Sequence, residues 1–277
     1  MYNLNGTIAA DFQVSLQNNR AFLYGDAVFE TIKVVDNNIL FLEDHYFRLM
    51  ASMRILRMEI PDQFTMEFFE NQILELKNAI APAPSYRIRI TVYRDSDGFY
   101  YPNSKEVSFL MHVLPLQNKL FQLNNTPLEI ELFKDFSINA QLLSTLKSTN
   151  RMVQITGSIF AKENGYDNCV VLNTDKNVAE ALDSNIFMVV GNHIVTPPLA
   201  DGCLNGILRK QLIAMLSKTE GYTFEEKSIS PFDLQKADEL FLTNAIKGIQ
   251  SVTKYRKKSF DNKVAQALLN KLNLQLI

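Results

Sequence analysis

The sequence predicts an α+β fold in two lobes, and three observations support this class. Segments with the strict alternation of β-strands occur beside segments with the three-to-four-residue spacing of amphipathic helices. The chain has 277 residues, which is enough for one large or two modest domains, and 47% of them are hydrophobic, which predicts a packed core. The stretch LQNKLFQLNNTPL is polar and irregular, so it is expected to separate the lobes. We expect a small N-terminal lobe over residues 1–117, a linker over 118–128 and a larger C-terminal lobe over 129–277.

The first lobe is expected to contain strands followed by helices. TIKVVDNNILFL predicts two strands around a turn at residues 36–38. Helical spacing follows in DHYFRLMASMRILRM and in FTMEFFENQILELKNAI. The stretch SYRIRITVYR then alternates and predicts a strand, which VSFLMHVLPL is expected to pair with. One face of this strand carries Tyr86, Ile88, Ile90 and Val92, and the other carries Arg87, Arg89 and Thr91.

In the second lobe the order of elements changes. A helix is expected over about 148–164, ending at Asn164-Gly165, with an apolar stripe of Met152, Ile155, Ile159 and Phe160. Residues 168–198 predict a meander of three strands, with turns at 174–177 and 191–192. Another helix is expected to begin after Asn205 as its N-cap, and the last over about 261–274.

Composition argues against several classes of function. The formal net charge of −2 gives no support for binding nucleic acid or an acidic membrane surface, which would favour a basic excess. Only two cysteines occur, neither in a CxxC pair, which fits a reducing, cytoplasmic location and argues against a disulfide framework or a zinc site. We find no signal peptide and no apolar stretch of membrane-spanning length.

The stretch LLSTLKSTNR places a single lysine, Lys147, between two pairs of hydroxyl residues. Most lysines are solvated surface charges, so this is the first interpretation to consider. The sequence has no GxSxG, P-loop or GxGxxG motif, and its three histidines are not spaced as metal ligands. Hydrolase, kinase and metalloenzyme functions therefore lose support, and no metal is expected. Lysine, glutamate and arginine remain as the candidate catalytic residues.

Three further features suggest an anionic cofactor with a reactive aldehyde. DGCLNGILRKQLI carries Gly202 and Gly206 around a predicted helix start, where backbone N–H groups could bind a phosphate. Arg48 lies in a predicted helix and could pair with phosphate in a bidentate way. Glu180 interrupts the apolar strand NVAEAL and could hold a pyridinium nitrogen protonated. Each also has an ordinary interpretation, namely a helix cap, a solvated arginine and a glutamate that faces water.

The motifs together resemble the class IV aminotransferase family, the fold-type IV pyridoxal-phosphate enzymes. This family includes branched-chain and D-amino-acid transaminases and 4-amino-4-deoxychorismate lyase. The resemblance covers almost the whole chain and keeps the family's motif order. The matching stretches are YGDAVFET, DHYFRL, LKSTNR, EALDSNIF, TPP, NGILR and ADELFLTNA.

The resemblance implies a role for each matched residue. Lys147 corresponds to the Schiff-base lysine, Glu180 to the glutamate at the pyridine nitrogen and Arg48 to the phosphate arginine. It also implies a barrel-like C-terminal lobe, pyridoxal 5′-phosphate as cofactor, a small amino substrate and a homodimer with its active site between the lobes. The remaining cofactor residues that it implies are Asn185, Gly206, Ile207, Leu208 and Asn244, and the remaining substrate residues are Tyr24, Phe29 and Arg94.

The choice between lyase and transaminase depends on secondary signals. KSTNR and NGILR resemble the lyase patterns, and LTNA has Asn244 and Ala245 where transaminases usually have a small residue and a phosphate-binding threonine. One feature favours the transaminase. In YRDSDGFYYP the lyase's first loop arginine is kept as Arg94, but Phe99 occupies the position of the second. We expect the lyase slightly ahead of an amino-acid transaminase that uses 2-oxoglutarate, with a catalytically inactive scaffold protein as a third possibility. Ser148 and Thr149 are expected to cap the following helix.

Overall fold

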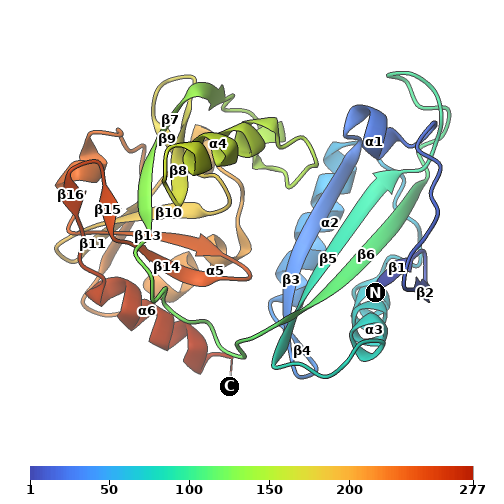
Figure 1. Ribbon diagram of the computed structural model, residues 1–277, viewed down its shortest axis with the longest axis horizontal. Coiled ribbons are helices and arrows are strands. Elements are labelled where there is room, and N and C mark those ends of the chain that lie inside the picture. Colours follow the sequence, from blue (N-terminus) through green and yellow to red (C-terminus); the bar gives the residue numbers. More distant parts are fainter. Residues whose placement is uncertain (277) are drawn as a thin grey trace. The chain divides into compact units, whose positions relative to one another are not determined.

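The computed structural model describes residues 1–276, and the chain forms two compact units (Figure 1). The first unit contains Met1–Lys119 together with Lys147–Asn150, and the second contains Leu120–Leu146 and the chain from Arg151 onward. The first boundary lies within the expected linker. The four residues from Lys147 differ from the expected division, because they group with the first unit.

The first unit is built on a six-stranded sheet with the order β2-β1-β6-β5-β3-β4. Long antiparallel pairings join β5 to β3 and to β6, as the alternating pattern of β5 predicts. Three helices complete the unit. The bounds of the strands are β1 Tyr2–Leu4, β2 Thr7–Ala9, β3 Ala27–Val35, β4 Asn38–Ile39, β5 Ser85–Arg94 and β6 Val107–Leu116, and those of the helices are α1 Arg20–Tyr24, α2 Leu42–Ile55 and α3 Met66–Asn78.

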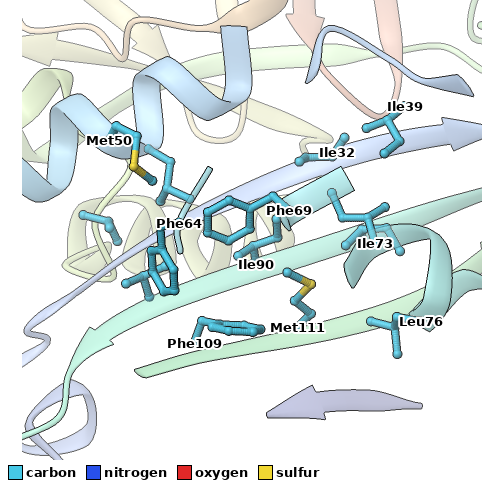
Figure 2. Packing of buried hydrophobic residues seen from close by; sticks show 14 of the residues in the cluster. Ile32, Ile39, Met50, Phe64, Phe69, Ile73, Leu76, Ile90, Phe109 and Met111 are labelled. Atoms are coloured by element: carbon cyan, nitrogen blue, oxygen red, sulfur yellow. The ribbon is translucent and has the colours of Figure 1, made fainter. Parts of the chain in front are cut away.

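Helices α2 and α3 contribute to a core that covers only one face of this sheet. Figure 2 shows the core, in which Phe64 and Phe69 meet at a centroid distance of 5.0 Å and Phe109 packs edge-on against Phe64. Burying a side chain of this size contributes about 1.5–3 kcal/mol. Ile88 and Ile90 of β5 point into this core, so Arg87, Arg89 and Thr91 lie on the opposite face of the sheet.

The second unit contains two five-stranded sheets, with the orders β12-β11-β10-β13-β14 and β16-β15-β7-β8-β9. Buried residues of both sheets form one shared core, including Val170 and Ala181 from one and Ile186 and Leu242 from the other, as expected of a barrel-like lobe. The bounds are β7 Glu129–Ile138, β8 Asn168–Asn173, β9 Val178–Ala181, β10 Asn185–Val190, β11 His193–Thr196, β12 Thr223–Glu226, β13 Glu239–Asn244, β14 Gly248–Val252, β15 Lys254–Tyr255 and β16 Lys258–Ser259, with helices α4 Met152–Glu163, α5 Ile207–Leu216 and α6 Lys263–Leu274.

Several predictions about the second unit were wrong. The meander is four strands rather than three, because a turn at Asp183-Ser184 separates β9 from β10 and places them in different sheets. Helix α4 begins at Met152 rather than near Ser148. Its expected apolar stripe is largely on the surface, since Met152, Ile155 and Ile159 are each more than half exposed. None of the helices in the described part of the chain is long and apolar enough to cross a membrane.

Candidate active site

The late start of α4 has a local cause in the first unit. The backbone N–H of Phe29 donates to the Lys147 carbonyl at 2.8 Å, and the Thr149 N–H donates to the Ala27 carbonyl at 3.0 Å. Ser148 forms an antiparallel bridge with Val28 between these two bonds. Lys147 to Thr149 is therefore extended and adds a short strand to the edge of β3, which prevents helix formation.

The hydroxyl and amide side chains after Lys147 support this strand. The Thr149 hydroxyl donates to the Gly25 carbonyl at 2.9 Å, and the Asn150 amide donates to the same oxygen at 3.1 Å. The prediction that Ser148 and Thr149 cap α4 was therefore wrong, since the N-cap is Arg151, whose side chain makes no capping hydrogen bond to the helix. In the second unit Arg151 donates to the Leu146 carbonyl at 2.6 Å, which ties together the two ends of the Lys147–Asn150 segment.

The amine of Lys147 lies at an aromatic ring that is shared with a guanidinium. Lys147 Nζ is 4.7 Å from the centroid of the Phe29 ring, and the guanidinium carbon of Arg89 is 3.8 Å from the same centroid. Arg89 Nε also donates to the Thr91 hydroxyl at 3.3 Å. A reactive amine and a cation that can bind a carboxylate are therefore close together. Sequence reasoning missed Arg89 as a site residue, although the alternation of β5 already separated it from the core face.

Arg48 belongs to a buried charged network of the first unit. Its Nε and Nη2 atoms donate to the two carboxylate oxygens of Glu30 at 2.7 and 2.6 Å, and His45 Nδ1 lies 2.7 Å from Glu30 Oε2. Burial alone would raise the pKa of Glu30, but Arg48 and His45 lower it to about 2. Burial lowers the pKa of His45. Glu30 was also missed, although it is the one charged residue between the core-facing Val28 and Ile32.

The three residues expected to contact substrate occupy different environments. Phe29 lies at Lys147, as described above. Tyr24 ends the short helix α1, where its ring contacts Arg20 and Tyr100. Arg94 is buried, and its three guanidinium nitrogens donate to Asp26 and to the backbone carbonyls of Leu56 and Arg57 at the end of α2. These bonds make Arg94 a structural residue of the first unit, which argues against the expected contact with substrate.

In the second unit, Glu180 and Asn185 fix the segment that leads into α5. Glu180 is buried on β9; Oε2 accepts from the Leu204 N–H at 2.8 Å and Oε1 accepts from the Gln154 amide at 3.1 Å. Asn185 donates to the Leu204 carbonyl at 2.8 Å. The backbone N–H and carbonyl of Leu204 are therefore both bound by side chains that the sequence motifs identified, namely Glu180 and Asn185. Gln154 was missed, because its position on α4 carried no motif.

The start of α5 carries neither a side-chain cap nor an acidic residue. Gly206 rather than Asn205 is the N-cap, and no side chain caps the helix, so the prediction for Asn205 was wrong. The first turn of α5 has no acidic residue, and its backbone N–H groups at Ile207 and Leu208 point out of the helix end. A Cβ at Gly206 would overlap the Asn185 side-chain oxygen, so only glycine allows this close approach.

Asn244 supports a turn of the second unit. Its side-chain oxygen accepts from the backbone N–H of Ile246 at 2.9 Å, and its amide donates to the Asp183 carbonyl at 2.7 Å. Its neighbour Thr243 is buried, and its hydroxyl has no hydrogen-bond partner in the described residues. The contacts of Asn244 therefore account for this residue without a cofactor.

Each unit carries side chains or backbone groups that are suited to bind pyridoxal 5′-phosphate. The first unit offers the amine of Lys147 and the guanidinium of Arg48. The second offers a buried carboxylate at Glu180 and an uncapped helix start behind Gly206. An amine for an aldehyde, a carboxylate for a ring nitrogen and backbone N–H groups for a phosphate are the groups that this cofactor needs.

Known proteins with similar sequences and structures agree with this fit. A sequence model of the amino-transferase class IV family matches residues 27–255. A provisionally named branched-chain-amino-acid aminotransferase of Methanocaldococcus jannaschii is 28% identical over 274 residues, covering 97% of this chain and 92% of the relative. The aminodeoxychorismate lyase of Vibrio harveyi is 27% identical over 246 residues, covering 85% of each chain.

Among solved structures, the branched-chain aminotransferase of Thermoproteus uzoniensis with norvaline superposes with a TM-score of 0.86 at 24% identity, covering 98% of this chain and 92% of that one. This likeness confirms the α+β fold of the fold-type IV enzymes. The family uses pyridoxal 5′-phosphate and acts on small amino substrates. The chain therefore belongs to the amino-transferase class IV family and is a pyridoxal-phosphate-dependent enzyme.

Proposed function

We propose that this enzyme is an amino-acid transaminase that acts on apolar amino acids of the branched-chain type, with 2-oxoglutarate as amino acceptor. The cofactor supplies an aldehyde that binds an amine and a ring that accepts electrons. Lys147 would bind the aldehyde and then move a proton at the α-carbon of the substrate. Glu180 would keep the ring nitrogen protonated. Arg48 and the N–H groups of Ile207 and Leu208 would hold the phosphate.

The observation that carries the proposal is the shared ring of Lys147 and Arg89. An α-amino acid presents its carboxylate one carbon away from the amine that reacts. Arg89, with its guanidinium carbon 3.8 Å from the centroid of the Phe29 ring over which Lys147 Nζ lies, offers a cation for that carboxylate near the reactive amine. The Phe29 ring adds an aromatic group at the same place. A monocarboxylate with an apolar side chain fits these groups.

The signals in the sequence that favoured the lyase have structural explanations. Asn150 and Arg151 of KSTNR hold the backbone of Gly25 and Leu146, so their presence does not require a particular substrate. Arg94, the loop arginine retained from the lyase pattern, is bonded to Asp26 and to the end of α2. The retention of Arg94 therefore gives no support to the lyase.

The named relatives also support a transaminase. Four of the most similar ones carry names of branched-chain-amino-acid aminotransferases, from Methanocaldococcus jannaschii, Aquifex aeolicus, Rickettsia bellii and Thermotoga maritima. The lyase of Vibrio harveyi has an identity in the same range, so relatedness alone does not choose between the reactions. The lyase remains the second candidate because NGILR and LTNA follow the lyase pattern. The Asn244 of LTNA also has a structural use, since its side chain accepts a hydrogen bond in a turn of the second unit.

Two parallel assays of the purified enzyme with pyridoxal 5′-phosphate test the proposal. One offers leucine, isoleucine, valine, D-alanine and other amino acids with 2-oxoglutarate and measures glutamate. The other offers 4-amino-4-deoxychorismate and measures pyruvate and 4-aminobenzoate. We expect glutamate from the branched-chain amino acids and no product in the second assay. If the second assay gives pyruvate and 4-aminobenzoate and the first gives no glutamate, the enzyme is the lyase and the transaminase proposal is wrong. Lys147→Ala serves as the blank for both.

We further infer that the enzyme is a homodimer that pairs through α4. The open surface of this helix is formed by Gln154, Ile155, Ser158, Ile159, Lys162 and Glu163. No charged residue occurs from Met152 to Ala161, so the stripe of Met152, Ile155 and Ile159 suits an equally uncharged partner.

A second copy of α4 has the required chemistry. In an antiparallel pair around a two-fold axis near Ile155, Met152 would meet Ile159 of the partner subunit. Because Gln154 of this helix bonds Glu180 at 3.1 Å, pairing would also order a contact of the candidate site.

A further inference from the structure

We propose that Thr243 is a binding residue for the phosphate of the cofactor, and that its hydroxyl donates a hydrogen bond to this phosphate at the start of α5. The inference rests on the proposed function, in which the backbone N–H groups of Ile207 and Leu208 bind the phosphate. It adds a side chain to which no motif assigns a role, and it concerns groups of the second unit alone.

The hydroxyl of Thr243 is buried without a hydrogen-bond partner. The residue is 3% exposed, and Oγ1 has no partner among the residues that the structure describes. Burying a hydroxyl without a hydrogen bond costs free energy, so such groups are uncommon and require an explanation. Thr196, a buried threonine of the same sheet, shows the usual arrangement, because its hydroxyl donates to the Ile186 carbonyl at 2.7 Å. The Thr243 hydroxyl therefore indicates a partner that the chain itself does not supply.

Strand alternation shows which face of the sheet carries this hydroxyl. Leu242 of β13 belongs to the core shared by the two sheets, so its neighbours Phe241 and Thr243 lie on the opposite face. The ring of Phe241 stacks on that of Phe187 from β10 at a centroid distance of 5.0 Å. The same face of β10 therefore carries Phe187 and, two residues earlier, Asn185. Thr243 and Asn185 thus lie on one face of the sheet.

Asn185 connects this face of the sheet to the start of α5. Strands β10 and β13 are antiparallel, and Asn185 pairs directly with Thr243. Side chains that oppose each other in this way have Cβ atoms about 4.5–5.5 Å apart. On its other side Asn185 touches the N-cap of α5, since a Cβ at Gly206 would overlap its side-chain oxygen. Thr243 therefore lies one side chain away from the helix start.

A phosphate is the partner that suits a hydroxyl at this place. The first turn of α5 has no acidic residue and no side-chain cap, so the positive end of the helix dipole favours an anion there. A hydroxyl adds a donor to these backbone N–H groups, and its hydrogen bond is stronger when the acceptor is charged. A buried water is the alternative partner. A water would satisfy the hydroxyl equally for a ligand with or without a phosphate, which allows a test.

The experiment compares Thr243→Val with the unchanged full-length enzyme, using pyridoxal 5′-phosphate and pyridoxal as the two probes. Both probes carry the aldehyde, but only the first carries a phosphate. Calorimetric titration of the cofactor-free proteins gives the two dissociation constants, and their ratio defines the phosphate preference. We expect Thr243→Val to bind pyridoxal 5′-phosphate about tenfold more weakly, and pyridoxal within about twofold of the unchanged enzyme. Thr243→Ser keeps the hydroxyl and should retain the phosphate preference.

Thr196→Val is the matched control, because it removes a buried hydroxyl of the same sheet that does have a partner within the chain. Loss of that hydrogen bond should lower the Tm of the cofactor-free protein and leave the phosphate preference unchanged. Thr243→Val should do the reverse. Its hydroxyl has no partner in the chain to lose, so the Tm without cofactor should stay the same or rise while the phosphate preference falls. Damage to the fold would not produce this combination.

The outcomes separate this inference from the proposed function. If the unchanged enzyme binds both probes equally, the phosphate site of the proposed function is wrong, and the role of Thr243 is overturned with it. If the unchanged enzyme prefers pyridoxal 5′-phosphate and Thr243→Val keeps that preference, the proposed function stands and the hydroxyl does not bind the phosphate. Equal weakening for both probes in Thr243→Val, or loss of the preference in Thr243→Ser as well, would also overturn the inference, because the hydroxyl would then not be the cause.

Discussion

The backbone N–H of Phe29 donates to the carbonyl of Lys147 at 2.8 Å, so the lysine is held at the edge of β3, beside the isolated bridge between Val28 and Ser148. This bond fixes the main chain on either side of the reactive amine and brings its Nζ to the ring of Phe29. The position of the amine therefore depends on strand pairing, which is more rigid than a loop.

Arg89→Leu is expected to raise the KM for the amino acid about tenfold or more while leaving the dissociation constant for pyridoxal 5′-phosphate unchanged. The reason is that Arg89 is the guanidinium nearest to the ring at which Lys147 lies. Steady-state kinetics with leucine measure the effect. Arg87→Leu is the matched control, because Arg87 lies on the same face of β5 two residues away. Equal effects of the two substitutions would contradict a specific role for Arg89.

Gly206→Ala is expected to weaken binding of pyridoxal 5′-phosphate, since the added methyl would overlap the Asn185 side-chain oxygen and displace the start of α5. The double variant with Asn185→Ala removes the overlapping atom. We expect the glycine substitution to cost less in that background, with a coupling of about 0.5–3 kcal/mol in a double-mutant cycle of cofactor binding. Additive effects would show that the two residues do not act together on the helix start.

Ile155→Glu is expected to shift the protein from dimer to monomer, because it places a charge in the middle of the apolar stripe on α4. Sedimentation velocity over a range of protein concentrations measures the change. Leu274→Glu provides the control, since Leu274 is an exposed apolar side chain at the end of α6. If the Ile155→Glu variant remains a dimer, or if the unchanged protein is a monomer, the proposal that α4 forms the dimer interface is wrong.

The acid stability of the protein should depend on Glu30. Its pKa is about 2 in the folded protein against an ordinary 4.5, so its ionisation stabilises the fold above pH 4.5, and this is lost as the pH falls toward 2. The contribution is on the order of 3 kcal/mol. The lowered pKa of His45 also reduces the stability of the fold as the pH falls below the ordinary value of 6.5, because the unfolded protein then binds this proton more readily than the folded protein.

Glu30→Gln should therefore flatten the pH dependence of stability. Urea unfolding followed by circular dichroism, between about pH 3 and pH 7, measures the free energy of unfolding for both proteins. The unchanged protein should lose more stability over the acidic part of this range. Parallel curves would indicate that the Glu30 network contributes little to acid sensitivity.

The regular parts of the fold could be predicted from the sequence because they depend on local periodicity. The alternation in Tyr86–Val92 correctly assigned the core face of β5, and the spacing in α2, α3 and α6 located these helices to within a few residues. Lys147, Glu180 and Asn185 were identified through motifs. The structure places Lys147 at the edge of β3 and the other two side chains at Leu204, just before α5, and their roles at a cofactor stay predictions.

What could not be predicted depends on contacts between distant parts of the chain. Ser148 and Thr149 have the composition of a helix cap, but their pairing with β3 overrides it. Asn205 appeared to be an N-cap, yet Gly206 takes that position, next to a Leu204 backbone that Glu180 and Asn185 hold. The exposed stripe of α4 has the periodicity of a buried one, because periodicity identifies an apolar face without showing what covers it.

The most direct test of the account is to identify the residue that binds the cofactor covalently. The enzyme is mixed with pyridoxal 5′-phosphate and reduced with borohydride, which fixes the cofactor to the amine that holds it, and the digested protein is mapped by mass spectrometry. The account predicts one stoichiometric modification, on Lys147, that is absent from Lys147→Ala. Stoichiometric modification of another lysine, or none at all, would contradict it.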